Sequence, residues 1–198
     1  MPKAYRVSLM LLFFAASLPF VHEGVAQMNK KAVMIIASSA FRDEELLETR
    51  AVLERNSVEV KVASTTLLPV KGMLQATVKP DMLVTDINLA DFDALIFVGG
   101  TGATQYWDDP LAQRLSQEAI NRNKIVAAIC IAPVTLAKAG ILKGKQATVW
   151  SSEANQLKAA GAKYTGRSVE TDGNIVTASG PAAAGEFAEE IVRALSRY

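Results

Sequence analysis

Three short and almost wholly apolar runs place the strongest constraint on how this chain can fold. The runs Lys31 to Ser38, Asp93 to Val98 and Ile125 to Ile129 are each bounded by small or polar residues. Continuous apolar runs of this length are typical of strands that are buried on both faces of a sheet. The sequence therefore predicts a central, mostly parallel sheet with a helical layer on each face.

The segments around these runs predict the helices and the remaining strands. Asp43 to Asn56 carries apolar residues at near-helical spacing and acids in its first turn, and Val58 to Val62 alternates as a strand. Pro110 to Asn123 is an amphipathic helix that begins with proline. Further predicted elements are an excursion over 68–87, a short helix ending near 140, a strand at 146–150, a helix near 153–160, a hairpin turned at 172–173 and a helix over 181–196. Together they predict one doubly wound α/β domain over residues 27–198.

The first 26 residues are typical of a secretory signal peptide. Lys3 and Arg6 give a positive start, 7–21 is almost wholly apolar, and 24–26 supplies small residues before the cut. The alternative is an uncleaved membrane anchor, but the apolar run is about fifteen residues and a bilayer span needs about twenty. We therefore expect export across the inner membrane to the periplasm, with no membrane anchor after cleavage.

The charge balance of the mature chain bears on its partners. Removing residues 1–26 from the 198-residue chain leaves 172 residues with nineteen basic and nineteen acidic side chains. That balance argues against a nucleic acid or an anionic membrane as a partner. A single cysteine forms no internal disulfide, so the fold depends on its hydrophobic core.

The one cysteine, Cys130, lies where the apolar run 125–129 turns towards a helix that starts at Pro133. A nucleophile at a tight strand-to-helix turn is held in strained backbone geometry and needs small residues on either side, here Ala128 and Ala132. Amides of the following helix favour the thiolate, which predicts a lowered thiol pKa. The alternative is that the cysteine is only a small buried apolar residue.

The only histidine, His22, falls in the predicted signal peptide. The mature chain then has no imidazole to act as a base for the thiol. Any mechanism must depend on Cys130, a carboxylate and backbone amides.

Several motifs, taken in order along the chain, resemble the ThiJ/PfpI family of deglycase-like proteins within the class I glutamine amidotransferase-like superfamily. They are Phe41 to Glu45, Phe97 to Gly100, Ala127 to Pro133, and the tail from Ser179 to Ala188. The resemblance implies a flavodoxin-like three-layer sandwich that forms a homodimer. It also implies a cysteine at a nucleophile elbow, with a glutamate from the first loop in contact with it.

On the family pattern the glutamate is Glu45, which should be protonated or share a proton with the thiol, because two adjacent negative charges repel. The backbone amides of Gly100 and Ile131 would form an anion pocket. Gly99, Tyr106 and Trp150 are expected to line it. Glycines 99, 100 and 102 lack the spacing of a dinucleotide site, and we expect no cofactor and no metal. The alternative for the acids at 43–45 is three solvated side chains that favour a helix N-terminus, and Glu44 is expected to be one of these.

The sequence departs from the family at three positions. Ile131 follows the cysteine where protease-like relatives have histidine. Trp150 stands where the deglycase subgroup recruits its histidine, and Ser179 stands where many relatives have arginine. Trp150 is expected either to cap the pocket or to belong to the core. Tyr106 and Trp107 are expected either to line its mouth or to contact a second copy.

Loss of a general base lowers a rate by about a hundredfold to ten-thousandfold, which disfavours peptide hydrolysis. A thiolate needs less help to attack a small reactive carbonyl or a peroxide. We therefore expect a role in oxidative or carbonyl stress, through cysteine oxidation or weak glyoxalase or deglycase-type chemistry. A redox sensor or chaperone without turnover and an inert binding scaffold remain as alternatives, so enzymatic activity is left open.

Overall fold

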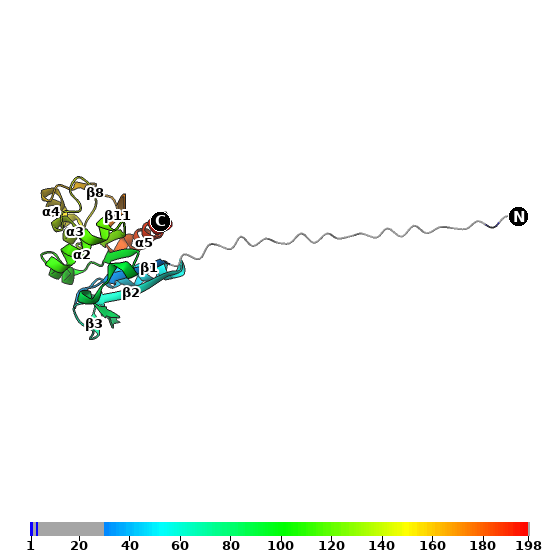
Figure 1. Ribbon diagram of the computed structural model, residues 1–198, viewed down its shortest axis with the longest axis horizontal. Coiled ribbons are helices and arrows are strands. Elements are labelled where there is room, and N and C mark those ends of the chain that lie inside the picture. The colour runs from blue at the N-terminus through cyan, green and yellow to red at the C-terminus, as the bar shows by residue number, and fades with distance from the viewer. Residues whose placement is uncertain (2, 4–29, 198) are drawn as a thin grey trace.

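The computed structural model describes residues 1, 3 and 30–197 (Figure 1). The predicted signal peptide lies outside the described residues except for 1 and 3. Within the described part, no helix combines the length and the apolar character that a membrane span requires.

A seven-stranded sheet forms the centre of the described domain, in the order β10-β11-β7-β6-β1-β2-β5. Neighbouring strands run parallel except at the β10–β11 edge, which is antiparallel. The strands are β1 (Lys30–Ile35), β2 (Val58–Ser64), β5 (Met82–Leu83), β6 (Ala94–Phe97), β7 (Ile125–Ile129), β10 (Val169–Asp172) and β11 (Ile175–Ala178). The three apolar runs of the sequence supply β1, β6 and β7, which are adjacent at the centre of the sheet.

Helices cover both faces of this sheet. Alternate residues of β1 point to opposite faces, so Met34 packs in one core cluster and Ile35 in the other. The first cluster includes residues of α1 (Asp43–Arg55) and α5 (Ala184–Leu195). The second includes residues of α2 (Pro110–Asn121), α3 (Pro133–Lys138) and α4 (Ala154–Ala159). In Figure 1, α2, α3 and α4 gather together, apart from α5. The expected three-layer, flavodoxin-like sandwich is confirmed.

Short strands and 3-10 turns lie outside the central sheet. The excursion over 68–87 contains an antiparallel hairpin of β3 (Val70–Lys71) and β4 (Thr77–Val78). The strand predicted over 146–150 is shorter than expected, because only β8 (Gln146–Ala147) forms, and it pairs with β9 (Lys163–Tyr164) outside the central sheet. Short 3-10 turns occupy Val84–Asp86, Leu89–Asp91, Thr101–Tyr106, Ser151–Glu153 and Pro181–Ala183.

The carboxyl ends of β1, β6 and β7 determine where the site lies. These strands are adjacent and parallel, so the loops that follow them open at the same edge of the sheet. In open α/β sheets this edge is where ligands bind. The loops after β1, β6 and β7 begin near Ser38, Gly99 and Cys130.

Candidate active site

Cys130 lies at the turn between β7 and the loop that leads into α3. Its φ of +63° places a residue with a side chain in the left-handed region, a conformation that costs about 1–3 kcal/mol and is typical of functional sites. Its N–H donates to the carbonyl of Ala178 at 2.9 Å, and its own carbonyl accepts the N–H of Trp150 at 2.8 Å. Hydrogen bonds on both sides therefore hold the strained residue, as the predicted elbow requires.

Glu45 reaches the cysteine from the first turn of α1. Its side chain is fully buried, and Oε2 accepts the N–H of Gly99 at 2.9 Å. Oε1 is buried and makes no hydrogen bond of regular geometry within the described residues. The carboxyl and the Cys130 thiol nevertheless lie close enough for each to act on the pKa of the other. The structure thus brings together the two side chains that the sequence placed at one site.

Gly99 allows this approach because it has no side chain. A Cβ at this position would lie 2.5 Å from the Cβ of Cys130 and 2.5 Å from Oε2 of Glu45. Real contacts of this kind are essentially never that short, so any larger residue would separate the pair. The expectation that Gly99 lines the cavity is wrong, because the lining does not include it. Its role is to allow the close approach of Cys130 and Glu45.

Burial controls the protonation of this pair. Burial raises the pKa of Glu45 to about 7, although the thiol and the Gly99 amide oppose that rise. Burial and then the charge of Glu45 raise the pKa of the Cys130 thiol, while the amides of Gly100 and Ile131 lower it. The predicted lowering of the thiol pKa is therefore wrong, because burial raises this pKa and the charge of Glu45 adds to the rise. The two groups titrate as a coupled pair. At pH values above the Glu45 pKa, one proton remains on the pair.

The amides of Gly100 and Ile131 face the sulfur as expected, since both act on the thiol pKa as hydrogen-bond donors. Gly100 reaches this position with a φ of +98°, in the region that favours glycine. Its missing Cβ also matters, because a Cβ there would lie 2.4 Å from the nitrogen of Arg42. Two amides aimed at one sulfur stabilise negative charge on that sulfur or on an oxygen bonded to it.

A cavity of about 260 Å³ opens above the sulfur. It is lined by Arg42, Met73, Gly100, Thr101, Cys130, Ile131, Trp150 and Pro181. Trp150 is 47% exposed, and its ring packs against Gly180, where a Cβ would lie 2.7 Å from the ring. Trp150 thus forms one wall of the cavity and does not belong to the core. Among the described residues, no group of three histidine, cysteine or acidic side chains is arranged to hold a metal ion.

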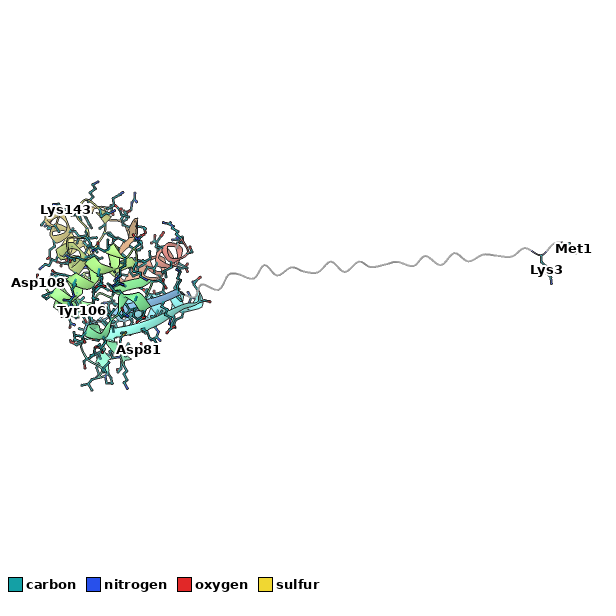
Figure 2. All side chains as sticks on the ribbon, in the orientation of Figure 1. Met1, Lys3, Asp81, Tyr106, Asp108 and Lys143 are labelled. Carbon is teal, nitrogen blue, oxygen red and sulfur yellow. The ribbon has the colours of Figure 1, made fainter. Side chains whose placement is uncertain are left out.

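Tyr106 does not line this cavity, contrary to expectation. Its side chain is 2% exposed, its hydroxyl donates to the carbonyl of Ile36 at 2.9 Å, and its ring packs edge-on against Phe97. Figure 2 labels Tyr106 among the side chains of the described domain. The 3-10 turn over Thr101–Tyr106 directs the ring inward, which the sequence pattern did not show. The neighbouring Trp107 instead supports the elbow, because its indole N–H donates to the carbonyl of Ile131 at 3.2 Å.

Two further residues near the site were not anticipated. Asp43 is buried, and its carboxylate accepts the N–H groups of Leu74 and Ala76 at 2.8 and 2.7 Å, so the alternative of a solvated acid does not hold for this residue. Arg42 lines the cavity and forms a two-pronged ion pair with Glu44 at 2.8 and 2.9 Å. What pointed to Arg42 in the sequence was its position in the motif Phe41 to Glu45, which resembles the family. The direction of its side chain depends on the tertiary fold.

A family model described as the DJ-1/PfpI family matches residues 30–194, which include the elbow, Glu45 and both amide donors. The chain belongs to the DJ-1/PfpI family. A crystal structure of a ThiJ/PfpI domain protein from Brachyspira murdochii has the same fold, with a TM-score of 0.83 at 32% identity over 85% of this chain and 97% of that chain.

Relatives whose names state an activity have lower sequence identity to this chain than an uncharacterized archaeal relative has. An uncharacterized protein of Methanocaldococcus jannaschii is 45% identical over 172 residues, 85% of this chain and 84% of that protein. The glutathione-independent glyoxalase DJR-1.2 of Caenorhabditis elegans is 28% identical over 167 residues, 84% of this chain and 89% of that protein. The deglycase PfpI of Pyrococcus furiosus is 28% identical over 163 residues, 82% and 98% of the two chains. This DJ-1/PfpI protein thus has glyoxalase and deglycase homologues at modest identity.

Proposed function

We propose that this protein uses Cys130 as a nucleophile on small dicarbonyl compounds, in glyoxalase-type or deglycase-type chemistry that counters carbonyl stress. The observation that carries the proposal is the buried contact between the Cys130 thiol and the Glu45 carboxyl, beneath a cavity open to a small molecule. The names of the glyoxalase and deglycase relatives support the same reaction class.

The geometry supports a sequence of proton transfers that needs no histidine. Glu45 takes the thiol proton as the sulfur bonds to the aldehyde carbon of methylglyoxal, and the amides of Gly100 and Ile131 hold the developing charge. The alkoxide takes a proton and gives a hemithioacetal. Moving the hydrogen from the first carbon to the second, through Glu45, yields a lactoyl thioester. Water then releases lactate and restores the thiol, so no external oxidant or reductant is consumed.

Methylglyoxal turnover by the mature protein tests this proposal. Cys130→Ser and Glu45→Gln should each abolish the production of lactate, because the first removes the nucleophile and the second removes the base. Glu48→Gln is the matched control, since Glu48 is an exposed acid in the same helix. Lactate production that is unchanged in either site variant would remove the enzymatic proposal.

A second candidate function is a cysteine that responds to oxidants without turnover. The two amides that face the sulfur favour it, because they would stabilise the oxygens of an oxidised cysteine. Peroxide would convert the thiol to a sulfenic acid with release of water, and a second peroxide would give the sulfinic acid. Mass spectrometry after mild peroxide treatment should show the gain of two oxygens on Cys130. Oxidation that is no faster at Cys130 than at the exposed Met73 would argue against this role.

A further inference from the structure

We infer that the cavity above Cys130 selects small aldehydes that carry a carboxylate next to the reacting carbonyl, and that Arg42 binds this carboxylate. The inference rests on the proposed function, because it names the substrate class of the same nucleophile. It adds a binding role for a residue that the sequence did not place in the site.

Arg42 is the one charged side chain among the residues that line the cavity. The remaining walls are the apolar side chains of Met73, Ile131, Trp150 and Pro181, together with Gly100 and Thr101. The pKa of the Arg42 guanidinium is raised chiefly by its hydrogen bond to Glu44, and negative charge on the Cys130 sulfur adds a smaller contribution, which places the two side chains near each other. A ligand bonded to the sulfur would therefore meet a single positive charge.

The Arg42 guanidinium is fixed and yet keeps free donors. Its Nε and Nη2 donate to Glu44 at 2.8 and 2.9 Å, and its backbone N–H donates to Gly99 at 2.9 Å. An arginine has five side-chain N–H groups. Within residues 30–197, Nη1 makes no hydrogen bond, so the edge formed by Nη1 and the second Nη2 hydrogen is open. That planar edge has the geometry for a carboxylate.

Glu44 opposes this attraction, because its charge offsets that of Arg42. The two side chains are 27% and 31% exposed, so water screens their interaction. Glu44 therefore holds the guanidinium in position and weakens its electrostatic attraction for an anion. Removing the negative charge at residue 44 should strengthen the preference for anionic ligands, and removing the positive charge at residue 42 should abolish it.

The size of the cavity limits the ligand. A volume of about 260 Å³ is below the common range of about 300–1,000 Å³ for drug-sized ligands. Glyoxylate, which joins an aldehyde directly to a carboxylate, is a suitable probe. The sulfur bonds to the aldehyde carbon, the carbonyl becomes a C–O single bond, and the thiol proton passes through Glu45 to the new oxygen. The product is a reversible hemithioacetal, and nothing is oxidised or reduced.

A pair of alkylating reagents isolates the effect of charge. Iodoacetate is anionic and iodoacetamide is neutral, and both label the same sulfur. Because both reagents react with the thiolate, the ratio of their rates at a fixed pH does not depend on the fraction of Cys130 in that form. Arg42→Gln should lower the iodoacetate-to-iodoacetamide ratio about two- to fivefold, the range for an ion pair screened by solvent. Glu44→Gln should raise the ratio, and Arg42→Lys should keep most of it.

Arg50→Gln is the matched control, because Arg50 forms a similar ion pair with Glu54 at 2.7 Å outside the cavity. Its ratio should equal that of the unaltered protein. Glyoxylate should also protect Cys130 from iodoacetamide better than acetaldehyde does, and Arg42→Gln should remove that difference.

Equal ratios in the unaltered protein, Arg42→Gln and Glu44→Gln would overturn the inference, even where methylglyoxal turnover persists. In that outcome the proposed function stands and only the substrate class is wrong. A Cys130 that reacts with neither reagent would overturn the proposed function together with the inference.

Discussion

At the scale of single residues, the contact between Cys130 and Glu45 places two reactive groups together at a cost in folding stability. The cysteine has a φ of +63°, and the carboxyl is fully buried with one oxygen lacking a regular hydrogen bond. Each of these features is unfavourable in a structural core. Their presence together beneath a cavity is typical of a functional site.

The raised pKa of Glu45 predicts how stability depends on pH. Burial raises the pKa from 4.5 to about 7, so between these values the folded protein holds a proton that the unfolded chain has released. Stability from this group is thus complete below pH 4.5 and is lost as the pH rises through about 7, by about 3 kcal/mol in total. Urea unfolding should show that Glu45→Gln gains stability relative to the unaltered protein over this window. A constant difference between the two proteins would contradict the buried carboxyl.

Gly99 offers a second test at this scale. Gly99→Ala places a Cβ 2.5 Å from both members of the pair, so the thiol and the carboxyl must separate. We expect the alkylation rate of Cys130 and methylglyoxal turnover to fall by roughly tenfold or more, since small displacements of reacting groups have large effects. Gly185→Ala is the control, because a Cβ there meets nothing within 4 Å and alanine favours helix. Equal losses in both variants would show that close approach at Gly99 is unimportant.

The residue scale also shows what the sequence could predict. Cys130 follows from a local motif, because a buried strand that turns sharply into a helix has a local signature. Glu45 and Gly100 were assigned from the resemblance to the ThiJ/PfpI family. The low thiol pKa could not be predicted, because the opposing burial and the Glu45 charge depend on the folded surroundings. The inward direction of Tyr106 and the position of Arg42 on the cavity wall depend likewise on the tertiary fold.

At the scale of elements, the start of α1 organises the mouth of the cavity. Asp43 fastens the β3–β4 hairpin through the amides of Leu74 and Ala76. Met73 lies between β3 and Leu74 in the chain, and its sulfur accepts the N–H of Thr101 at 3.4 Å. One buried carboxylate thus connects the helix that holds Glu45 to a wall of the cavity.

Asp43→Asn tests this connection. An amide accepts one of the two N–H groups but presents its own N–H₂ to the other, so we expect a loss of about 2–3 kcal/mol in unfolding free energy. Hydrogen exchange at Leu74 and Ala76 should become faster than in the rest of the domain. Glu48→Gln, at an exposed acid in the same helix, should change neither quantity. Unaltered protection at both amides would contradict the role of Asp43.

The elements themselves were largely predictable. The apolar runs gave β1, β6 and β7, and the acids and prolines that begin helices gave α1 and α2 within two residues. The end of β8 was not predictable from apolar character alone. Beyond Ala147 the chain turns towards the elbow, where the N–H of Trp150 binds the carbonyl of Cys130. That long-range hydrogen bond replaces pairing within a sheet.

At the scale of the whole molecule, we propose that the protein is exported and acts as a periplasmic homodimer. The predicted signal peptide supports export, and the resemblance to the ThiJ/PfpI family supports a dimer. Exposed apolar side chains such as Leu47 on α1 offer contact area for a second copy. Native mass spectrometry of the exported protein should give the mass of two chains that each begin at Gln27. A single chain that still begins at Met1 would contradict both parts of the proposal.

The most direct test of the central claim is the pH dependence of Cys130 alkylation by iodoacetamide, measured on the mature protein and on Glu45→Gln. With a Glu45 pKa of about 7, the pair loses its first proton near that pH. Above it, a small and constant fraction of the singly protonated pair carries the negative charge on sulfur, because the thiol has the higher pKa of the two. The rate should therefore rise through about pH 7 and then level off, and Glu45→Gln should lose this step. Identical profiles that both rise only near the free-cysteine value of about 8.5 would contradict the claim.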